Sequence, residues 1–419
     1  MVGIVRQNYS GSIEDYVISG IDSASTVTIE NVSVEGASLK GFTITGGYGR
    51  GVSFEDFISL AADPEAFDSL ITQVLRGGGI SVMNASPLLR DLIITENTAR
   101  NVGAGLGLVN SNAIVESVEI INNTIPDGDA LGGGGIAVNG GYPKIDDAAI
   151  IGNVVGINQY YLNGGGGILC GFSFDGEPLQ LEITNSFILN NTANIGGGLG
   201  ALSGNVQFRR VLIAGNTGDY GSAISLGEPL GLAINDINLN ISHSTITHNN
   251  GYIGVGMINS AQIIAVNSII RDNGEIEFSP LPNNDQLNVF MSYSNTEDEW
   301  PGLGNITSDP LFTDPASTDF TLQSSSPCID AGTEDADEDG NQDIFDFSGT
   351  APDMGAFEHS ALECNETGDV NNDNSVNILD IVNVVNLILS DQFDTCADLN
   401  SDSNINILDI VIIINQILD

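Results

Sequence analysis

The stretch Leu92–Asn97, LIITEN, is the repeating unit of this chain, because its sequence pattern recurs six more times. In every copy an isoleucine stands three residues before a closing asparagine. The closing asparagines, separated by 24 to 38 residues, are Asn97, Asn123, Asn153, Asn191, Asn216, Asn249 and Asn273. A pattern that recurs at such a period is typical of a solenoid in which each unit is one coil.

Short β-branched runs between glycines and asparagines predict that each coil consists of strands and turns. One coil cannot bury its apolar side alone, so the coils must stack and place one isoleucine above the next. Asparagine tolerates the left-handed conformation of a turn, and its amide can bond to the asparagine of the next coil. Glycine tripeptides mark other corners, where positive φ is needed. The sequence predicts an all-β right-handed single-stranded parallel β-helix.

Three domains are expected. Residues 1–325 form the β-helix, and an amphipathic helix is inserted at 51–76, where Asp63-Pro64 supplies a cap and a first helical proline. This insert either caps a groove or covers exposed core. Residues 326–363 form a closing segment and linker, and residues 364–419 form a small helical domain.

The charge balance excludes some partners. Ten Lys and Arg residues stand against 55 Asp and Glu residues, for a net charge of −45. Such a surface repels phosphate backbones, and it repels acidic polysaccharides unless divalent cations bridge the two.

No apolar run approaches the ~18 residues of a membrane span. The N-terminus lacks the apolar region of a signal peptide, so we expect an export signal lost upstream of Met1.

Two acidic loops near the C-terminus match in register. DVNNDNSVNILD at 369–380 recurs as DLNSDSNINILD at 398–409, and an apolar run follows each. Oxygen donors at loop positions 1, 3, 5, 7, 9 and 12 suit Ca²⁺, which takes six to eight oxygen ligands. The predicted ligands are Asp369, Asn371, Asp373, Ser375, Asn377 and Asp380, then Asp398, Asn400, Asp402, Asn404, Asn406 and Asp409.

This duplicated loop and helix resembles a dockerin module over residues 364–419. The resemblance implies a cohesin-like partner or cell-surface scaffold, with recognition positions at Ile378, Leu379, Ile407 and Leu408. The alternative is that these four residues are core positions of the helices. Loop position 6, usually glycine, is Asn374 and Ser403. Ten acidic side chains and no Lys or Arg in this segment predict folding that depends on calcium.

Three further features lie in or after the closing segment, namely a cysteine pair, a third acidic loop and a terminal motif. Cys364 and Cys396 flank one calcium loop and are the only pair we consider for a disulfide. A third acidic loop, DADEDGNQDIFD, offers Asp335, Asp337, Asp339, Asp343 and Asp346 with calcium spacing. The frame SPCIDAGT followed by DMGAFE is similar to the closing segment of secreted bacterial β-helix proteins of the pectate-lyase-like superfamily. That resemblance implies an extracellular or cell-surface location.

A polar column lies six residues before each repeat asparagine. It reads Asp91, Ser117, Asp147, Asn185, Arg210, His243 and Asn267. If the isoleucines face inward, strand alternation predicts that this column faces outward. Asp91, Asp147, Arg210 and His243 are the candidate catalytic residues, because an arginine beside aspartates could act as the base of a calcium-dependent lyase. The alternative is a solvated face, and the sequence contains no RxPxxR motif like that of classical pectate lyases.

Three functions are compatible with these features. The protein could be a secreted β-helix module that binds or processes polysaccharide and is tethered through its dockerin to a cohesin. It could be an active calcium-dependent polysaccharide lyase, or a glycoside hydrolase. It could also be a non-catalytic adhesin or structural surface protein, because the superfamily includes proteins of each kind.

Overall fold

The computed structural model describes most of the chain. The described ranges are 17–20, 24–31, 37–53, 56, 76–156, 164–171, 179–227, 236–257, 261–280, 288–337, 339–359, 368–370, 375–390, 396–400 and 404–418. The chain divides into one compact unit of residues 1–308 with 354–357 and another of residues 309–353 with 358–419. The predicted helix within 51–76 lies almost wholly outside the described residues. The predicted domain boundaries at 325 and 363 remain predictions.

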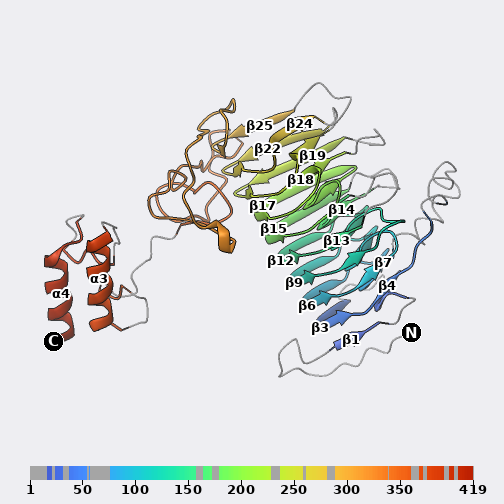
Figure 1. Cartoon of the computed structure of the whole chain (residues 1–419), viewed down its shortest axis with the longest axis horizontal. Helices are drawn as coiled ribbons and strands as arrows, with labels where there is room; N and C mark the ends of the chain where they lie inside the picture. Colours follow the sequence, from blue (N-terminus) through green and yellow to red (C-terminus); the bar gives the residue numbers. More distant parts are fainter. Residues whose placement is uncertain are drawn as a thin grey trace. The chain divides into compact units, whose positions relative to one another are not determined.

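The first unit is a parallel β-helix, as predicted (Figure 1). Its largest sheet contains β1 (Val17–Ser19), β3 (Ser38–Thr45), β6 (Leu88–Thr95), β9 (Ile114–Ile121), β12 (Lys144–Ile151), β15 (Gln180–Leu189), β17 (Gly204–Ala214), β19 (Ile237–Ser242), β20 (Thr245–Thr247), β22 (Ala261–Val266), β23 (Ile269–Arg271), β25 (Val289–Ser292) and β26 (Asn295–Thr296).

Two further sheets complete the coils. One contains β2 (Val27–Glu30), β5 (Ile80–Met83), β8 (Leu106–Val109), β11 (Ile136–Asn139), β14 (Ile168–Cys170), β16 (Leu199–Ala201), β18 (Tyr220–Leu226), β21 (Ile253–Met257) and β24 (Ile276–Pro280). The other contains β4 (Tyr48–Gly49), β7 (Thr98–Ala99), β10 (Thr124–Ile125) and β13 (Val154–Val155). Each strand pairs with the equivalent strand of the next coil. Corresponding positions of successive repeats therefore stack on one another.

The isoleucine of the repeat forms the inner column of the largest sheet. Ile94 pairs with Ile44 on one side and Ile120 on the other, and the column continues to Ile270. Each repeat isoleucine is completely buried. Cys170 is a buried free thiol in the same core, as predicted. Stacked aliphatic side chains therefore form the core along the whole set of coils.

The closing asparagines form a buried ladder, as predicted. The Asn97 Nδ2 donates to Asn123 Oδ1 at 3.0 Å and also to the Ile44 carbonyl at 2.9 Å. The same two bonds recur in the later coils, which explains why isoleucine and asparagine repeat together. One detail differs from the expectation, because the left-handed residue is the one before each asparagine, as at Glu96 (φ 54°) and Asn122 (φ 56°).

The polar column lies at a bend, where one additional residue interrupts the alternation of the strand. Five of its seven residues are exposed or half-buried, whereas His243 and Asn267 are buried. All seven of its residues have φ between 45° and 55°, including Asp91, Arg210 and His243. In β6 the residues on both sides of Asp91 pair with β9, whereas Asp91 itself does not. A left-handed residue inside a strand turns the chain and interrupts the alternation of side chains. The column therefore follows a corner of the coil.

Residues 354–357 return to the outer side of the largest sheet. Gly355 donates its N–H to the Asn267 carbonyl at 2.9 Å, and Ala356 donates to the Thr245 Oγ1 at 2.9 Å. The Phe357 ring stacks on Phe187 at 6.3 Å. This is the DMGAFE part of the closing motif, and it covers strands that would otherwise expose Ile269, which is completely buried.

The second unit contains a short hairpin and two helices. β27 (Phe312–Asp314) and β28 (Asp319–Leu322) pair in antiparallel fashion around a 3₁₀ turn at Pro315–Ser317. The helices are α3 (Ile378–Ser390) and α4 (Ile407–Leu418). They pack through a small core that contains Val384, Ile410 and Ile413. Among the described residues, no helix is long and apolar enough to cross a bilayer.

Candidate calcium and partner-binding site

The two acidic loops lead directly into α3 and α4. In the first, Asp380 accepts the backbone N–H of Val370 at Oδ1 (2.9 Å) and the N–H of Asn377 at Oδ2 (2.8 Å). Asn377 in turn accepts the Leu379 N–H at 2.9 Å and so caps the helix. Position 12 of the loop therefore connects the start of the loop to the first turn of the helix.

The second loop repeats this geometry. Asp409 accepts the N–H of Leu399 at 3.0 Å and the N–H of Asn406 at 2.9 Å, and Asn406 accepts the Leu408 N–H at 2.9 Å. The duplication seen in the sequence is therefore a duplication of hydrogen-bonded structure. Among the remaining predicted ligands, Asn371, Asp373 and Asp402 lie outside the described residues.

The donor set fits a divalent cation. Asp369, Asp380 and Asp409 are completely buried carboxylates in a segment that contains no Lys or Arg. Buried carboxylates are costly unless hydrogen bonds or a cation compensate their charge. Bound Ca²⁺ would supply that charge and would draw the loop oxygens together. The individual ligand assignments remain predictions.

The predicted partner-binding residues are exposed. Ile378 and Leu379 are 69% and 56% accessible, and Ile407 and Leu408 are 65% and 56% accessible. This argues against the alternative that they belong to the core of the helices. Further exposed apolar residues follow along α3 and α4, and the sequence pattern did not single them out. They are Val382, Leu389, Val411 and Leu418.

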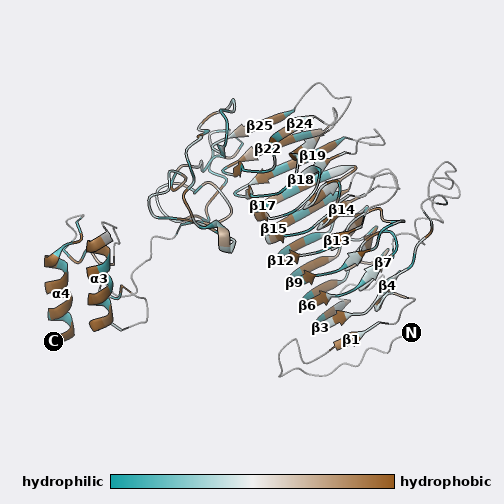
Figure 2. Ribbon diagram, in the orientation of Figure 1, coloured by the Kyte–Doolittle hydropathy of each residue, from teal (hydrophilic) through white to brown (hydrophobic). Residues whose placement is uncertain are grey.

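Figure 2 colours much of both helices as hydrophobic. Because the sequence of these helices is apolar on nearly every side, periodicity alone does not separate the exposed strip from the core. An exposed, contiguous apolar surface on a small domain is typical of a protein interaction site.

The third acidic loop brings three of its five predicted ligands together. The carboxylate oxygens of Asp335, Asp337 and Asp343 lie within 4.8 Å of one another. Asp335 also accepts the N–H groups of Asp339 and Gly340, which shapes the loop. Exposed acidic groups are common without an ion, so this loop, including Asp339 and Asp346, remains a predicted site.

The candidate catalytic column differs in exposure from coil to coil. Asp147 and Asn185 are exposed, whereas Asp91 and Arg210 are half-buried. Asp91 forms an ion pair with Lys40 at 3.3 Å, and Asp147 accepts the Ser117 hydroxyl at 2.7 Å. The strand register places Asp147 and Arg210 two coils apart, roughly 10 Å at the usual strand spacing.

His243 occupies a different environment from the other candidates. It is 1% exposed, and its Nε2 lies 3.1 Å from the Nδ2 of Asn267, which is also buried. A polymer on the surface could not reach this ring directly. The structure therefore does not bring the four candidates Asp91, Asp147, Arg210 and His243 into one catalytic group.

The cysteines outside the β-helix core behave in two ways. Cys396 is disulfide-bonded, and Cys328 is a buried free thiol. Cys364 lies outside the described residues. A disulfide at Cys396 ties the start of the second calcium loop to another part of the chain, which reduces the entropy of the unfolded state.

The comparisons with known proteins agree with this geometry. Residues 367–418 match the model of the Dockerin type I domain. The C-terminal segment is a dockerin type I domain. Dockerin type I domains bind calcium and cohesin partners. The repeated loops and the exposed strip of this dockerin supply the oxygen donors and the apolar surface that these two activities need.

One solved structure is similar to a large part of the chain. The crystal structure of pectate lyase Pel9A matches over 82% of this chain and 76% of its own, with 16% sequence identity and a TM-score of 0.46. No curated protein sequence matches the chain.

Proposed function

We propose that the protein is a secreted β-helix module that its dockerin attaches to a cohesin-bearing scaffold, where the β-helix binds or processes polysaccharide. The observation that carries the tethering is the pair of matched calcium loops, each leading to an exposed aliphatic pair at the start of its helix. An extracellular or cell-surface location follows from this proposal, because cohesin scaffolds act there.

The polysaccharide part of the proposal rests on the β-helix. Polar side chains repeat along one corner at the spacing of the coils, which gives a linear polymer a series of equivalent contacts. Asp147 and Asn185 are exposed, and Asp91, Ser117 and Arg210 are half-buried, so a polymer can reach these five members of the column. Calcium would also be needed to bridge an acidic polysaccharide to a protein of net charge −45.

The tethering is tested by binding of the full chain to an immobilised panel of type I cohesin domains, with calcium and with chelator. We expect binding to at least one cohesin that requires calcium. The combined variant I378A/L379A/I407A/L408A should lose it, and Leu303→Ala, which removes an equally exposed leucine of the β-helix, should keep it. The proposal would be contradicted if the chain bound no cohesin of the panel in calcium, or if it bound equally well in chelator.

The polysaccharide function is tested separately by a glycan screen of the full chain with and without calcium. Retention of a glycan supports binding. Formation of an unsaturated product, detected by ultraviolet absorbance on pectate or alginate, would favour the lyase. If the chain binds a cohesin but no glycan of the screen, the adhesive or structural alternative is favoured.

A further inference from the structure

The asparagine ladder has a fixed direction. At each step the backbone N–H and the side-chain Nδ2 of one asparagine both donate to the Oδ1 of the asparagine in the next coil, as from Asn191 to Asn216 at 2.9 and 3.0 Å. A backbone N–H can only donate, so the amide oxygen must face it. The amide orientation in every coil is therefore set by the backbone of the coil before it.

A ladder with one direction has two unlike ends. At the first end, Gly47 donates its N–H to Asn97 at 3.0 Å, and glycine needs no side-chain partner. At the last end, Asn273 accepts from Asn249 and is left with two donors of its own, its N–H and one Nδ2 hydrogen. Asn273 is completely buried, so these donors require a protein acceptor.

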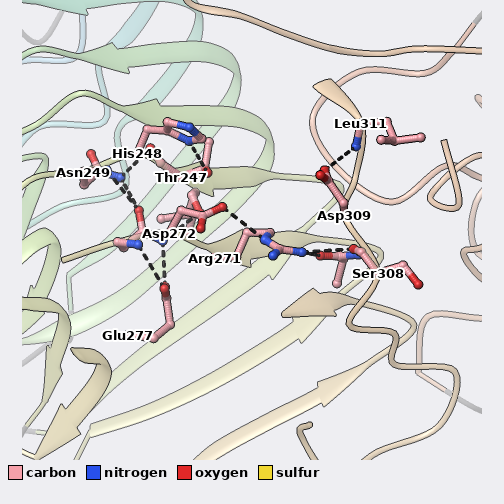
Figure 3. Close-up of polar contacts among 12 residues, drawn as sticks. Thr247, His248, Asn249, Arg271, Asp272, Glu277, Ser308, Asp309 and Leu311 are labelled. Carbon is pink, nitrogen blue, oxygen red and sulfur yellow. Dashed lines mark hydrogen bonds and ion pairs between the residues drawn. The ribbon is translucent and has the colours of Figure 1, made fainter. Parts of the chain in front are cut away.

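The next coil does not supply another asparagine. Thr296 takes the isoleucine position beside Ile270, and the residue three positions later is the exposed Glu299. Glu277 takes the role instead. Its Oε1 accepts the Asn273 Nδ2 at 2.7 Å, and its Oε2 accepts the Asn273 N–H at 3.0 Å. Figure 3 shows Asn249 and Glu277 at this end of the ladder, with Arg271 and Asp272 beside them.

We propose that Glu277 is the end cap of the asparagine ladder and a pH-sensitive clasp that joins the last ladder corner to β24. A carboxylate has only acceptors, and two parallel donors at the end of an aligned array are the arrangement that a carboxylate satisfies at a helix N-terminus. Glu277 lies only four residues after Asn273 in the sequence. Its bonds to Asn273 therefore fix the corner from which β24, the last strand of its sheet, starts.

The surroundings make this carboxylate sensitive to pH. Burial raises the pKa of Glu277 to about 7, the bonds from Asn273 lower it, and the nearby charges of Asp272 and Glu297 raise it. Arg271, a cation in the same region (Figure 3), donates to Asp272, to Asn295 and to the Ser308 carbonyl. No bond from Arg271 to Glu277 is seen among the described residues, so the ladder donors are the main stabilisers of the charged form.

The raised pKa of Glu277 determines how the stability of the fold changes with pH. The ordinary pKa of the group is 4.5, and the folded value is about 7. Between these two values the folded protein holds a proton that the unfolded chain has released. The protonated form of Glu277 therefore contributes to the free energy of unfolding below about pH 4.5, and this contribution is lost as the pH rises through 7.

The test compares wild type, Glu277→Ala, Glu277→Gln and Glu275→Ala in the full chain. Glu275 is an exposed neighbour on the same turn and serves as the matched control. Backbone amide exchange and thermal unfolding are measured from pH 5 to 8.5. For Glu277→Ala we expect the amide of Asn273 to exchange about tenfold faster or more, because a buried donor has lost its acceptor.

Glu277→Gln keeps one acceptor and carries no charge, so it separates the clasp from a general folding defect. We expect the unfolding temperature of wild type to fall relative to Glu277→Gln as the pH rises through 7. The proposal is overturned if Glu277→Ala behaves like Glu275→Ala, or if the difference between wild type and Glu277→Gln does not change with pH.

Discussion

Asp380 joins the first calcium loop to α3 by accepting the N–H of Asn377 at 2.8 Å, while its other oxygen accepts the N–H of Val370. Asp409 does the same in the second loop. The position-12 aspartate therefore serves both as a predicted ligand and as the residue that closes the loop onto its helix. Its removal should affect metal binding and helix formation together.

We expect Asp380→Ala to lower calcium affinity by about tenfold or more and to reduce helicity, because the cap and the loop closure are lost with the carboxylate. Isothermal titration with calcium and circular dichroism of the full chain measure the two effects. Asn415→Ala, at an exposed position of α4, is the control and should change neither. Loss of calcium affinity with unchanged helicity would show that the hydrogen bonds to Asp380 do not support α3.

Removal of one ladder asparagine should destabilise the β-helix more than removal of a surface asparagine. Asn216→Ala deprives the Asn191 N–H and Nδ2 of their acceptor and the Ile188 carbonyl of a donor. Unsatisfied buried polar groups of this kind predict a loss of about 3 kcal/mol in the free energy of unfolding.

Chemical denaturation checks the size of this loss. Asn240→Ala is the matched control, because Asn240 is an exposed asparagine of β19 in the next coil. Equal losses for the two variants would mean that the ladder contributes no more than a surface amide.

The sequence was sufficient to predict the parts of the fold that repeat. The isoleucine column, the asparagine ladder and the two calcium loops each recur in register, so one correct interpretation applies to every copy. The polar column also repeats, and alternation predicted its outward side for most members but did not predict the bend. Asp91 and its equivalents are left-handed residues, and the frequent Asp, Asn and His in that column are the types that favour positive φ.

Features that occur once were not predictable from the pattern. Glu277 caps the ladder from a position four residues after Asn273, and it accepts the donors that the next asparagine accepts in the earlier coils. The return of residues 354–357 to the β-helix joins positions such as Ala356 and Thr245, which are 111 residues apart in sequence. Local propensity carries no information about such contacts.

Gly355 should be required by close packing as well as by its backbone conformation. Its φ is 109°, and an added Cβ would lie 2.9 Å from the Thr245 Oγ1 and 3.0 Å from the Ile269 Cδ1. Gly128 has the same φ of 109°, but nothing lies within 4 Å of its Cβ position. Ala at either site must adopt the same positive φ, so the difference between the two variants reports mainly the effect of packing.

We expect Gly355→Ala to loosen the segment that covers the sheet and to lower the unfolding temperature more than Gly128→Ala does. Limited proteolysis checks the location of the effect, because cleavage should begin near residues 354–357 in the first variant only. Identical proteolysis and unfolding of the two variants would show that the contact with Thr245 and Ile269 adjusts without cost.

The polar column should divide into binding and structural residues. Arg210→Asn removes a half-exposed guanidinium but uses a residue that the column itself carries at Asn185, so the left-handed bend is kept. If the column contacts polysaccharide, this variant should elute earlier from a polysaccharide column in calcium. His243→Asn should keep the retention of wild type, because His243 is buried against Asn267 and cannot contact a polymer directly. Equal retention of the two variants would contradict this division and would favour a solvated corner without a binding role.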